Sequence, residues 1–80
     1  MKNRKQYKQY MKSDNWKSKR SQRIFKDGGM CQGVRAGKKC LSRFKLEVHH
    51  KTYIRMGNEL MDDLITLCHK CHLAIHKRAA

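Results

Sequence analysis

The 80-residue sequence contains no proline, no internal repeat and no low-complexity linker. Nothing in it therefore marks a boundary between two folded units, and we expect a single domain. A folded chain of this size buries only about 60% of the surface that its unfolded form exposes, so its apolar core is small. We therefore expect a cross-link or a bound metal to stabilise the fold.

Long apolar runs are also missing. No stretch is long enough to span a bilayer, and residues 1–12 are basic throughout, without the apolar centre of a secretory signal. These absences favour a cytoplasmic protein, or one of the host cytoplasm if a phage encodes it. Thiols stay reduced in that compartment, so the four cysteines are expected to bind zinc rather than to form disulfides.

Acidic residues are scarce. Six Asp and Glu stand against 20 Lys and Arg, giving a net charge of +14, and ten of the basic residues lie within residues 1–26. Such a charge attracts a polyanion, either nucleic acid or a membrane surface. The apolar stripe of residues 14–26 is thinner than the broad apolar face by which helices bind a membrane surface, so nucleic acid is favoured. We predict DNA as the partner and no membrane, with a merely solvated basic tail as the alternative for the first dozen residues. The predicted phosphate contacts are Lys17, Lys19, Arg20 and Arg23.

The first half of the chain predicts one helix. Ser13 is a suitable N-cap for a helix that begins at Asp14, and Gly28 and Gly29 end it. Apolar residues recur along this helix, and we expect them to anchor it in the core. We divide the chain into a basic N-terminal extension, residues 1–12, and one domain, residues 13–80. The expected core anchors of the helix are Trp16, Ile24 and Phe25.

The second half predicts a hairpin followed by a helix. Residues 46–51 alternate with the period of a strand, and residues 64–67 are short, apolar and β-branched. A polar loop, residues 52–62, joins them, and helical periodicity begins at His69. A loop over residues 30–45 precedes the hairpin. The expected fold is a small α+β domain, with a two-stranded antiparallel hairpin, a C-terminal helix and a preceding N-terminal helix.

The four cysteines form two pairs in the sequence. Cys68 and Cys71 have the CxxC spacing that lets two thiolates reach one zinc from a tight turn, and Cys31 and Cys40 are the remaining pair. We predict one structural zinc bound by all four. A buried pair of free thiols and a disulfide are the alternatives. A finger with two cysteines and two histidines is poorly supported, because no dozen-residue arm separates Cys71 from His72.

All five histidines lie in two short segments. His72 and His76 stand at positions i and i+4 of the predicted helix, about 40° apart around its axis. Together with a strand histidine they would converge on one cation that keeps positions open for water or substrate, as in a catalytic site. Neighbouring strand side chains diverge, so one of His49 and His50 can bind the ion while the other acts as a base. We assign His69 to ordinary packing or hydrogen bonding.

The segment "LEVHHKTYIRMGNELMDDLITLCHKCHLAIH" resembles the ββα-metal core of HNH endonucleases, especially the small cysteine-bearing kind common in phage and bacterial genomes. The segment "YMKSDNWKSKR…KDGGMC" resembles the helix that often precedes this core. The resemblance implies that His49 is a ligand of the catalytic cation and His50 the general base. It implies that His72 and His76 bind the metal or contact phosphate. Asp63 occupies the position of the family's central Asn, which is thought to hold the loop and orient the base.

The resemblance also implies an activity: metal-dependent hydrolysis of phosphodiester bonds in DNA, leaving 5′-phosphate and 3′-hydroxyl ends. The cofactors would be a structural Zn²⁺ and a catalytic divalent cation, Mg²⁺, Mn²⁺, Ni²⁺ or Zn²⁺. Two alternatives stay open. One is a non-catalytic, zinc-stapled DNA-binding module. The other is an accessory subunit of a phage DNA-packaging complex, with terminase subunits as partners. The sequence does not distinguish nicking from double-strand cleavage, and it leaves the oligomeric state open.

Overall fold

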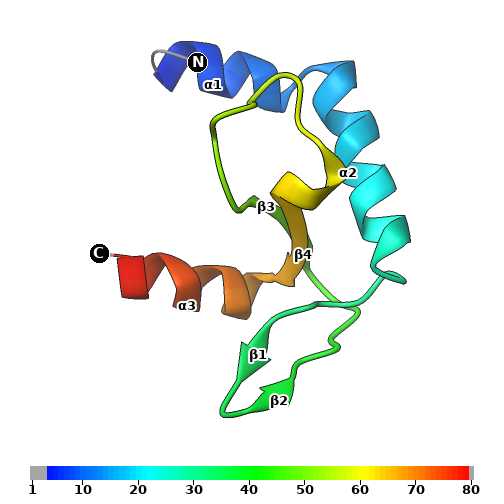
Figure 1. Cartoon of the computed structure of the whole chain (residues 1–80), viewed down its shortest axis with the longest axis vertical. Helices are drawn as coiled ribbons and strands as arrows, with labels where there is room; N and C mark the ends of the chain where they lie inside the picture. Colours follow the sequence, from blue (N-terminus) through cyan, green and yellow to red (C-terminus); the bar gives the residue numbers. More distant parts are fainter. Residues whose placement is uncertain (1–3, 80) are drawn as a thin grey trace.

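The computed structural model describes residues 4–79, and their side chains as far as residue 75 (Figure 1). The elements are α1 (Arg4–Met11), α2 (Asp14–Lys26), β1 (Val34–Arg35), β2 (Lys38–Lys39), β3 (Leu46–His50), the 3₁₀ helix η1 (Met61–Asp63), β4 (Leu64–Cys68) and α3 (His69–Ala79). The small α+β fold is confirmed, with a ββα unit formed by β3, β4 and α3. None of the described helices is long and apolar enough to cross a membrane.

The β3–β4 hairpin is the centre of the fold, and its two faces carry different side chains. The strands are antiparallel, with Leu46 opposite Cys68 and His50 opposite Leu64. Successive strand side chains point to opposite faces. Val48 and His50 are buried on the face covered by α2, whereas His49 lies on the face that meets α3. The two adjacent histidines are thus separated by the sheet.

The first core cluster joins α1, α2 and the hairpin through Tyr10, Trp16, Val48 and Leu64. Ile24 packs against this cluster as predicted, but Phe25 is 87% exposed, so its assignment to the core is wrong. The reason is helical geometry. At about 100° per residue, Phe25 lies about 180° around the helix from Trp16, on the solvent side.

Residues 4–11, predicted as part of a basic extension, form the helix α1. Its Tyr10 is buried in the first core cluster, so α1 packs on the domain. Ser13 joins α1 to α2: its Oγ accepts a hydrogen bond from the backbone N–H of Trp16 at 3.1 Å and donates one to the carbonyl of Tyr10 at 2.6 Å. The predicted N-cap is therefore confirmed.

The segment expected as a loop, residues 30–45, contains a second hairpin made of β1 and β2. Val34 pairs with Lys39, and Gly37 in the connecting turn has a φ of +77°, a conformation that glycine adopts without strain. This hairpin extends from the base of the fold, close to the start of α3 (Figure 1). Beside it lies the second core cluster, which is formed by Cys31, Leu67, Cys68 and Cys71.

Candidate functional site

The four cysteines come together at one point, although 40 positions separate the first from the last. Their Sγ atoms all lie within 4.8 Å of one another, and those of Cys40 and Cys68 are 3.8 Å apart. Four thiolates around a zinc ion at about 2.3 Å in a tetrahedron have sulfurs about 3.8 Å apart. All four cysteines are free of disulfides. The cluster therefore fits a four-thiolate zinc site.

Local structure explains how the cluster is assembled. Cys68 ends β4 and Cys71 lies in the first turn of α3, while backbone hydrogen bonds on both sides of Cys31 hold the loop after α2 in place. Gly33 is required for close approach, since a Cβ built there would lie 2.8 Å from the Sγ of Cys71. Its N–H also points at the Sγ of Cys31, at 3.3 Å. The backbone is thus shaped around the sulfurs.

The thiols in this cluster have unequal acidities. A backbone hydrogen bond from Ser42 lowers the pKa of Cys40 to about 7, and the guanidinium of Arg35 lies 3.8 Å from its sulfur. Burial, followed by the neighbouring thiols, raises the pKa of Cys71 to about 12. Four sulfurs this close cannot all carry a charge without a cation, and a coordinating metal deprotonates such thiols. The donor set therefore suits zinc.

A second cluster of metal-ligating side chains lies between β3 and α3. His49 Nδ1 and His72 Nε2 face each other at 3.1 Å, and the rings meet edge to face. Two nitrogens bound to one ion at about 2.0–2.1 Å would have this separation at an angle of about 100°. Such an angle lies between those of octahedral and tetrahedral coordination. The pair is therefore positioned to share one divalent cation.

Glu47 holds this pair in place, and the sequence analysis did not predict it. One of its carboxylate oxygens lies 2.6 Å from Nδ1 of His72, and the other lies 2.9 Å from Nδ1 of His69. A metal-binding histidine commonly donates its second ring N–H to a carboxylate, which fixes the tautomer and the ring orientation. Burial opposes the ionisation of Glu47, but its bonds with His72 and His69 outweigh this and lower its pKa. The alternation Glu47-Val48-His49 could have revealed this role of Glu47, because it places Glu47 and His49 on one face of the strand.

The third predicted ligand is His76. Its backbone lies in α3, one turn beyond His72, and its side chain is outside the described residues. Its assignment as metal ligand or phosphate contact stays a prediction.

His50 lies on the opposite face of the hairpin from His49. Its ring is stacked between those of Trp16 and Tyr53, with centroids at 4.6 and 5.3 Å, and the residue is 4% exposed. Its Nε2 is 2.7 Å from a carboxylate oxygen of Glu59. His50 is therefore not part of the His49–His72 pair. Its role as general base stays a prediction.

Glu59 is a buried carboxylate that sequence reasoning also missed, because nothing in its loop position marks it as buried. It accepts hydrogen bonds from the Tyr10 hydroxyl and from His50, and the Nζ of Lys19 lies 3.4 Å away. Burial raises its pKa, but the bonds from Tyr10 and His50 outweigh this effect and lower the pKa below its usual value. Burial and the bond to Glu59 both raise the pKa of Tyr10. This network joins α1, α2, β3 and the loop after β3.

Asp63, at the position of the family's central Asn, is buried at the end of η1. Its carboxylate pairs with Arg55 and accepts a hydrogen bond from the backbone N–H of Leu60 at 3.0 Å. The hydrogen bond from Arg55 is the main reason that the pKa of Asp63 falls to about 2. Both partners belong to the loop that joins β3 and β4. These contacts support a loop-holding role for Asp63, and its part in orienting the base stays a prediction.

Three of the four basic residues predicted to contact DNA are engaged within the fold. Lys19 donates to the carbonyl of Glu59 at 3.0 Å, and Arg20 donates to that of Leu46 at 3.1 Å. Arg23 pairs with Asp27 and donates to the carbonyl of Met61. Lys17 is exposed. The contact of these residues with DNA stays a prediction, and most of their charge already serves to fasten α2.

Comparison with known proteins gives one match. Residues 31–78 match the family model described as HNH endonuclease, and this segment includes all four cysteines and both histidines of the His49–His72 pair. No match is found among curated proteins or among solved structures.

Proposed function

The chain belongs to the HNH endonuclease family, and from this we propose that it hydrolyses phosphodiester bonds of DNA with a divalent cation bound between His49 and His72. The observation that carries the proposal is the approach of Nδ1 of His49 to Nε2 of His72 at 3.1 Å, with Glu47 behind His72. Without a cation, the separation of the two ring nitrogens is that of a hydrogen bond between the rings. The same separation suits two nitrogens that share one cation, with the carboxylate of Glu47 fixing the tautomer of His72.

The residues have separate tasks in the proposed reaction. When bound, the cation supplies positive charge to the phosphate and to the leaving 3′-oxygen. His49 and His72 hold it, with His76 as third ligand or as phosphate contact, and Glu47 keeps the Nε2 lone pair of His72 pointed at it. The structural Zn²⁺ at Cys31, Cys40, Cys68 and Cys71 fastens the start of α3, which carries His72.

His50 is the proposed general base. If its Nε2–H donates to Glu59, its Nδ1 keeps a lone pair and is the atom that removes a proton from the attacking water. Glu59 then fixes the tautomer of His50, as a carboxylate does for the histidine of a hydrolytic triad. The family's products, a 5′-phosphate and a 3′-hydroxyl, follow if water attacks in line with the 3′-oxygen.

The burial of His50 favours one alternative, a zinc-stapled DNA-binding module without catalysis. In that case the stack of His50 between Trp16 and Tyr53 serves only to join α2 and the hairpin. A second alternative keeps the site but places it in an accessory subunit of a phage packaging complex, with terminase subunits as partners and the host cytoplasm as location. Activity that appears only when a partner is added would point to this alternative.

Cleavage of supercoiled plasmid by the purified, zinc-loaded chain tests the proposal. Mg²⁺, Mn²⁺, Ni²⁺ and Zn²⁺ are added in turn to the wild type, His49→Ala and His50→Gln. Gln at position 50 can still donate to Glu59 but cannot act as a base, so it separates catalysis from packing. We expect His50→Gln to retain the fold and to cleave roughly 10²–10⁴-fold more slowly. Wild-type cleavage rates in both variants would contradict the proposal.

A further inference from the structure

A groove lies beside the zinc cluster, where the β1–β2 hairpin meets the start of α3. Its volume is about 390 Å³. It contains side chains from three separate segments, and none of them is acidic. The lining residues are Arg35, Cys40, Ser42, Phe44, Lys45, Cys68, His69 and Lys70.

Two exposed lysines give the groove its positive charge. Lys45 and Lys70 are exposed at its edge, whereas Lys19, Arg20 and Arg23 of α2 are bonded to other parts of the fold. Arg35 faces the sulfur of Cys40, so it is paired with the zinc site. The lysines of the groove are therefore positive charges available to a phosphate backbone.

The groove is connected to the candidate metal centre through three short contacts. His69, in the groove wall, lies 2.9 Å from one oxygen of Glu47, and the other oxygen lies 2.6 Å from His72. His72 in turn lies 3.1 Å from His49. The groove wall and the pair of histidines thus share one carboxylate, so a strand bound in the groove would lie close to the pair.

An aromatic ring completes the groove. Phe44 is 79% exposed, although its neighbours Ser42 and Lys45 are fixed by backbone contacts with Cys31 and His69. A phenylalanine this exposed gains little from the core of its own chain. Aromatic rings beside basic grooves commonly stack on unpaired bases.

We propose that this groove binds the DNA strand next to the scissile phosphate, an inference that rests on the proposed nuclease function. Lys45 and Lys70 contact backbone phosphates, and Phe44 stacks on an unpaired base. The preferred substrate is therefore DNA with a single-stranded or distorted segment at the cleavage position. Perfect duplex binds the groove through its phosphates alone.

The contribution of the lysines is tested by binding of fluorescently labelled single-stranded DNA to the zinc-loaded chain, without any added divalent cation. The groove variant is Lys45→Asn with Lys70→Gln. Asn suits position 45 because the backbone there has a φ of +51°. The control is Lys12→Gln with Lys26→Gln, which removes the same charge from exposed positions just before α2 and at its end.

We expect the groove variant to reduce the slope of log affinity against log salt by about 1.4, or about 0.7 for each phosphate that a lysine no longer neutralises. We expect the control to retain more of the wild-type slope than the groove variant. A groove variant with the wild-type slope, or one whose slope falls no more than that of the control, would overturn the proposal. Equal zinc content and equal circular dichroism of both variants show that neither has lost its fold.

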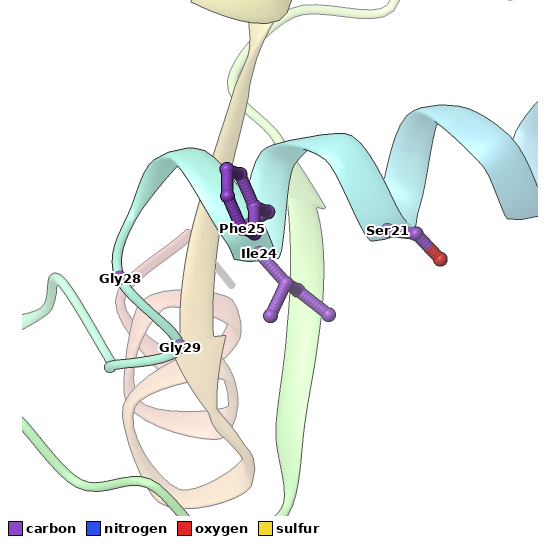
Figure 2. Close-up of a pocket in the computed structure, with 5 residues that line it drawn as sticks. All are labelled: Ser21, Ile24, Phe25, Gly28 and Gly29. Carbon is purple, nitrogen blue, oxygen red and sulfur yellow. The ribbon is translucent and has the colours of Figure 1, made fainter.

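The contribution of stacking has its own matched pair, because the chain has a second exposed phenylalanine. Figure 2 shows Phe25 at the end of α2, where it lines a separate hollow together with Ser21, Ile24, Gly28 and Gly29. We expect Phe44→Ala to weaken single-strand binding by about tenfold and to leave blunt duplex binding unchanged. Phe25→Ala should leave both unchanged. If both phenylalanine variants bind single strands equally well, Phe44 does not stack on a base.

Failure of the groove and failure of the nuclease function can be told apart. A wild-type chain that cleaves DNA, with groove variants that bind like wild type, overturns the groove and leaves the nuclease function intact. A wild-type chain that cleaves nothing with any cation, while the groove variants lose affinity as expected, confirms the groove as a binding site and overturns the nuclease function.

Discussion

Replacing Glu47 by Gln is expected to weaken binding of the catalytic cation by about tenfold without any loss of the fold. Glu47 lies 2.6 Å from Nδ1 of His72, and its carboxylate stabilises the tautomer whose Nε2 faces His49. A carboxylate accepts a stronger hydrogen bond than a neutral amide, and partners of metal ligands typically contribute 10–100-fold to metal affinity. Gln keeps an acceptor at this position, so we expect the lower end of that range, or about 1.4 kcal/mol. Glu47→Ala removes the acceptor and should approach a hundredfold loss.

The assay is calorimetric titration of Mn²⁺ into the zinc-loaded protein, with zinc content measured in each sample. His69→Ala is the matched control, because it removes the other partner of Glu47 and leaves His72 in place. We expect this control to bind Mn²⁺ within about twofold of wild type. Wild-type affinity in Glu47→Ala would refute the reasoning, and so would equal losses in Glu47→Gln and His69→Ala.

The remaining predictions concern the zinc cluster and the loop. Gly33→Ala should lower zinc content, measured by metal analysis, because its Cβ would lie 2.8 Å from the Sγ of Cys71; a fully loaded variant would contradict the site. Cys71→Ser, or a strong chelator, should abolish the folded circular dichroism spectrum, since structural zinc contributes on the order of 10–16 kcal/mol; an unchanged spectrum would exclude a structural zinc. Arg55→Ala should lower the melting temperature by a constant amount from pH 8 to pH 5. The bond with Arg55 depresses the pKa of Asp63 to about 2. The stabilisation by this pair is therefore complete above about pH 4, the usual pKa of Asp, and is lost as the pH falls from there through the depressed pKa of Asp63. A decrease in melting temperature that appears in only one part of the range from pH 8 to pH 5 would be inconsistent with the pair.

The elements of the ββα unit were predictable because their periodicities are strong. The alternation in residues 46–50 and the CxxC turn at Cys68 indicated the strand, the hairpin and the start of the last helix. Convergence of the four cysteines followed from their number and from the small size of the chain. Such patterns predict structure reliably, because the spacing of apolar residues decides which face of a strand or helix is buried.

What the sequence did not reveal depends on contacts between distant segments. Glu59 is nine positions from His50 and 49 from Tyr10, and no local pattern indicates that these side chains meet. The contact between Lys19 and Glu59 has the same origin, because 40 positions separate the two residues. The prediction for Phe25 is wrong because apolar character does not decide burial on a helix, and Phe25 lies on the side of α2 opposite Trp16.

Crystallography of the zinc-loaded chain with Mn²⁺, with anomalous scattering recorded at the manganese edge, tests the central claim most directly. We expect one manganese peak within bonding distance of His49 Nδ1 and His72 Nε2, and a separate zinc peak among the four cysteines. A manganese ion bound elsewhere, or none at His49 and His72 under conditions in which the same protein cleaves plasmid, would contradict this claim.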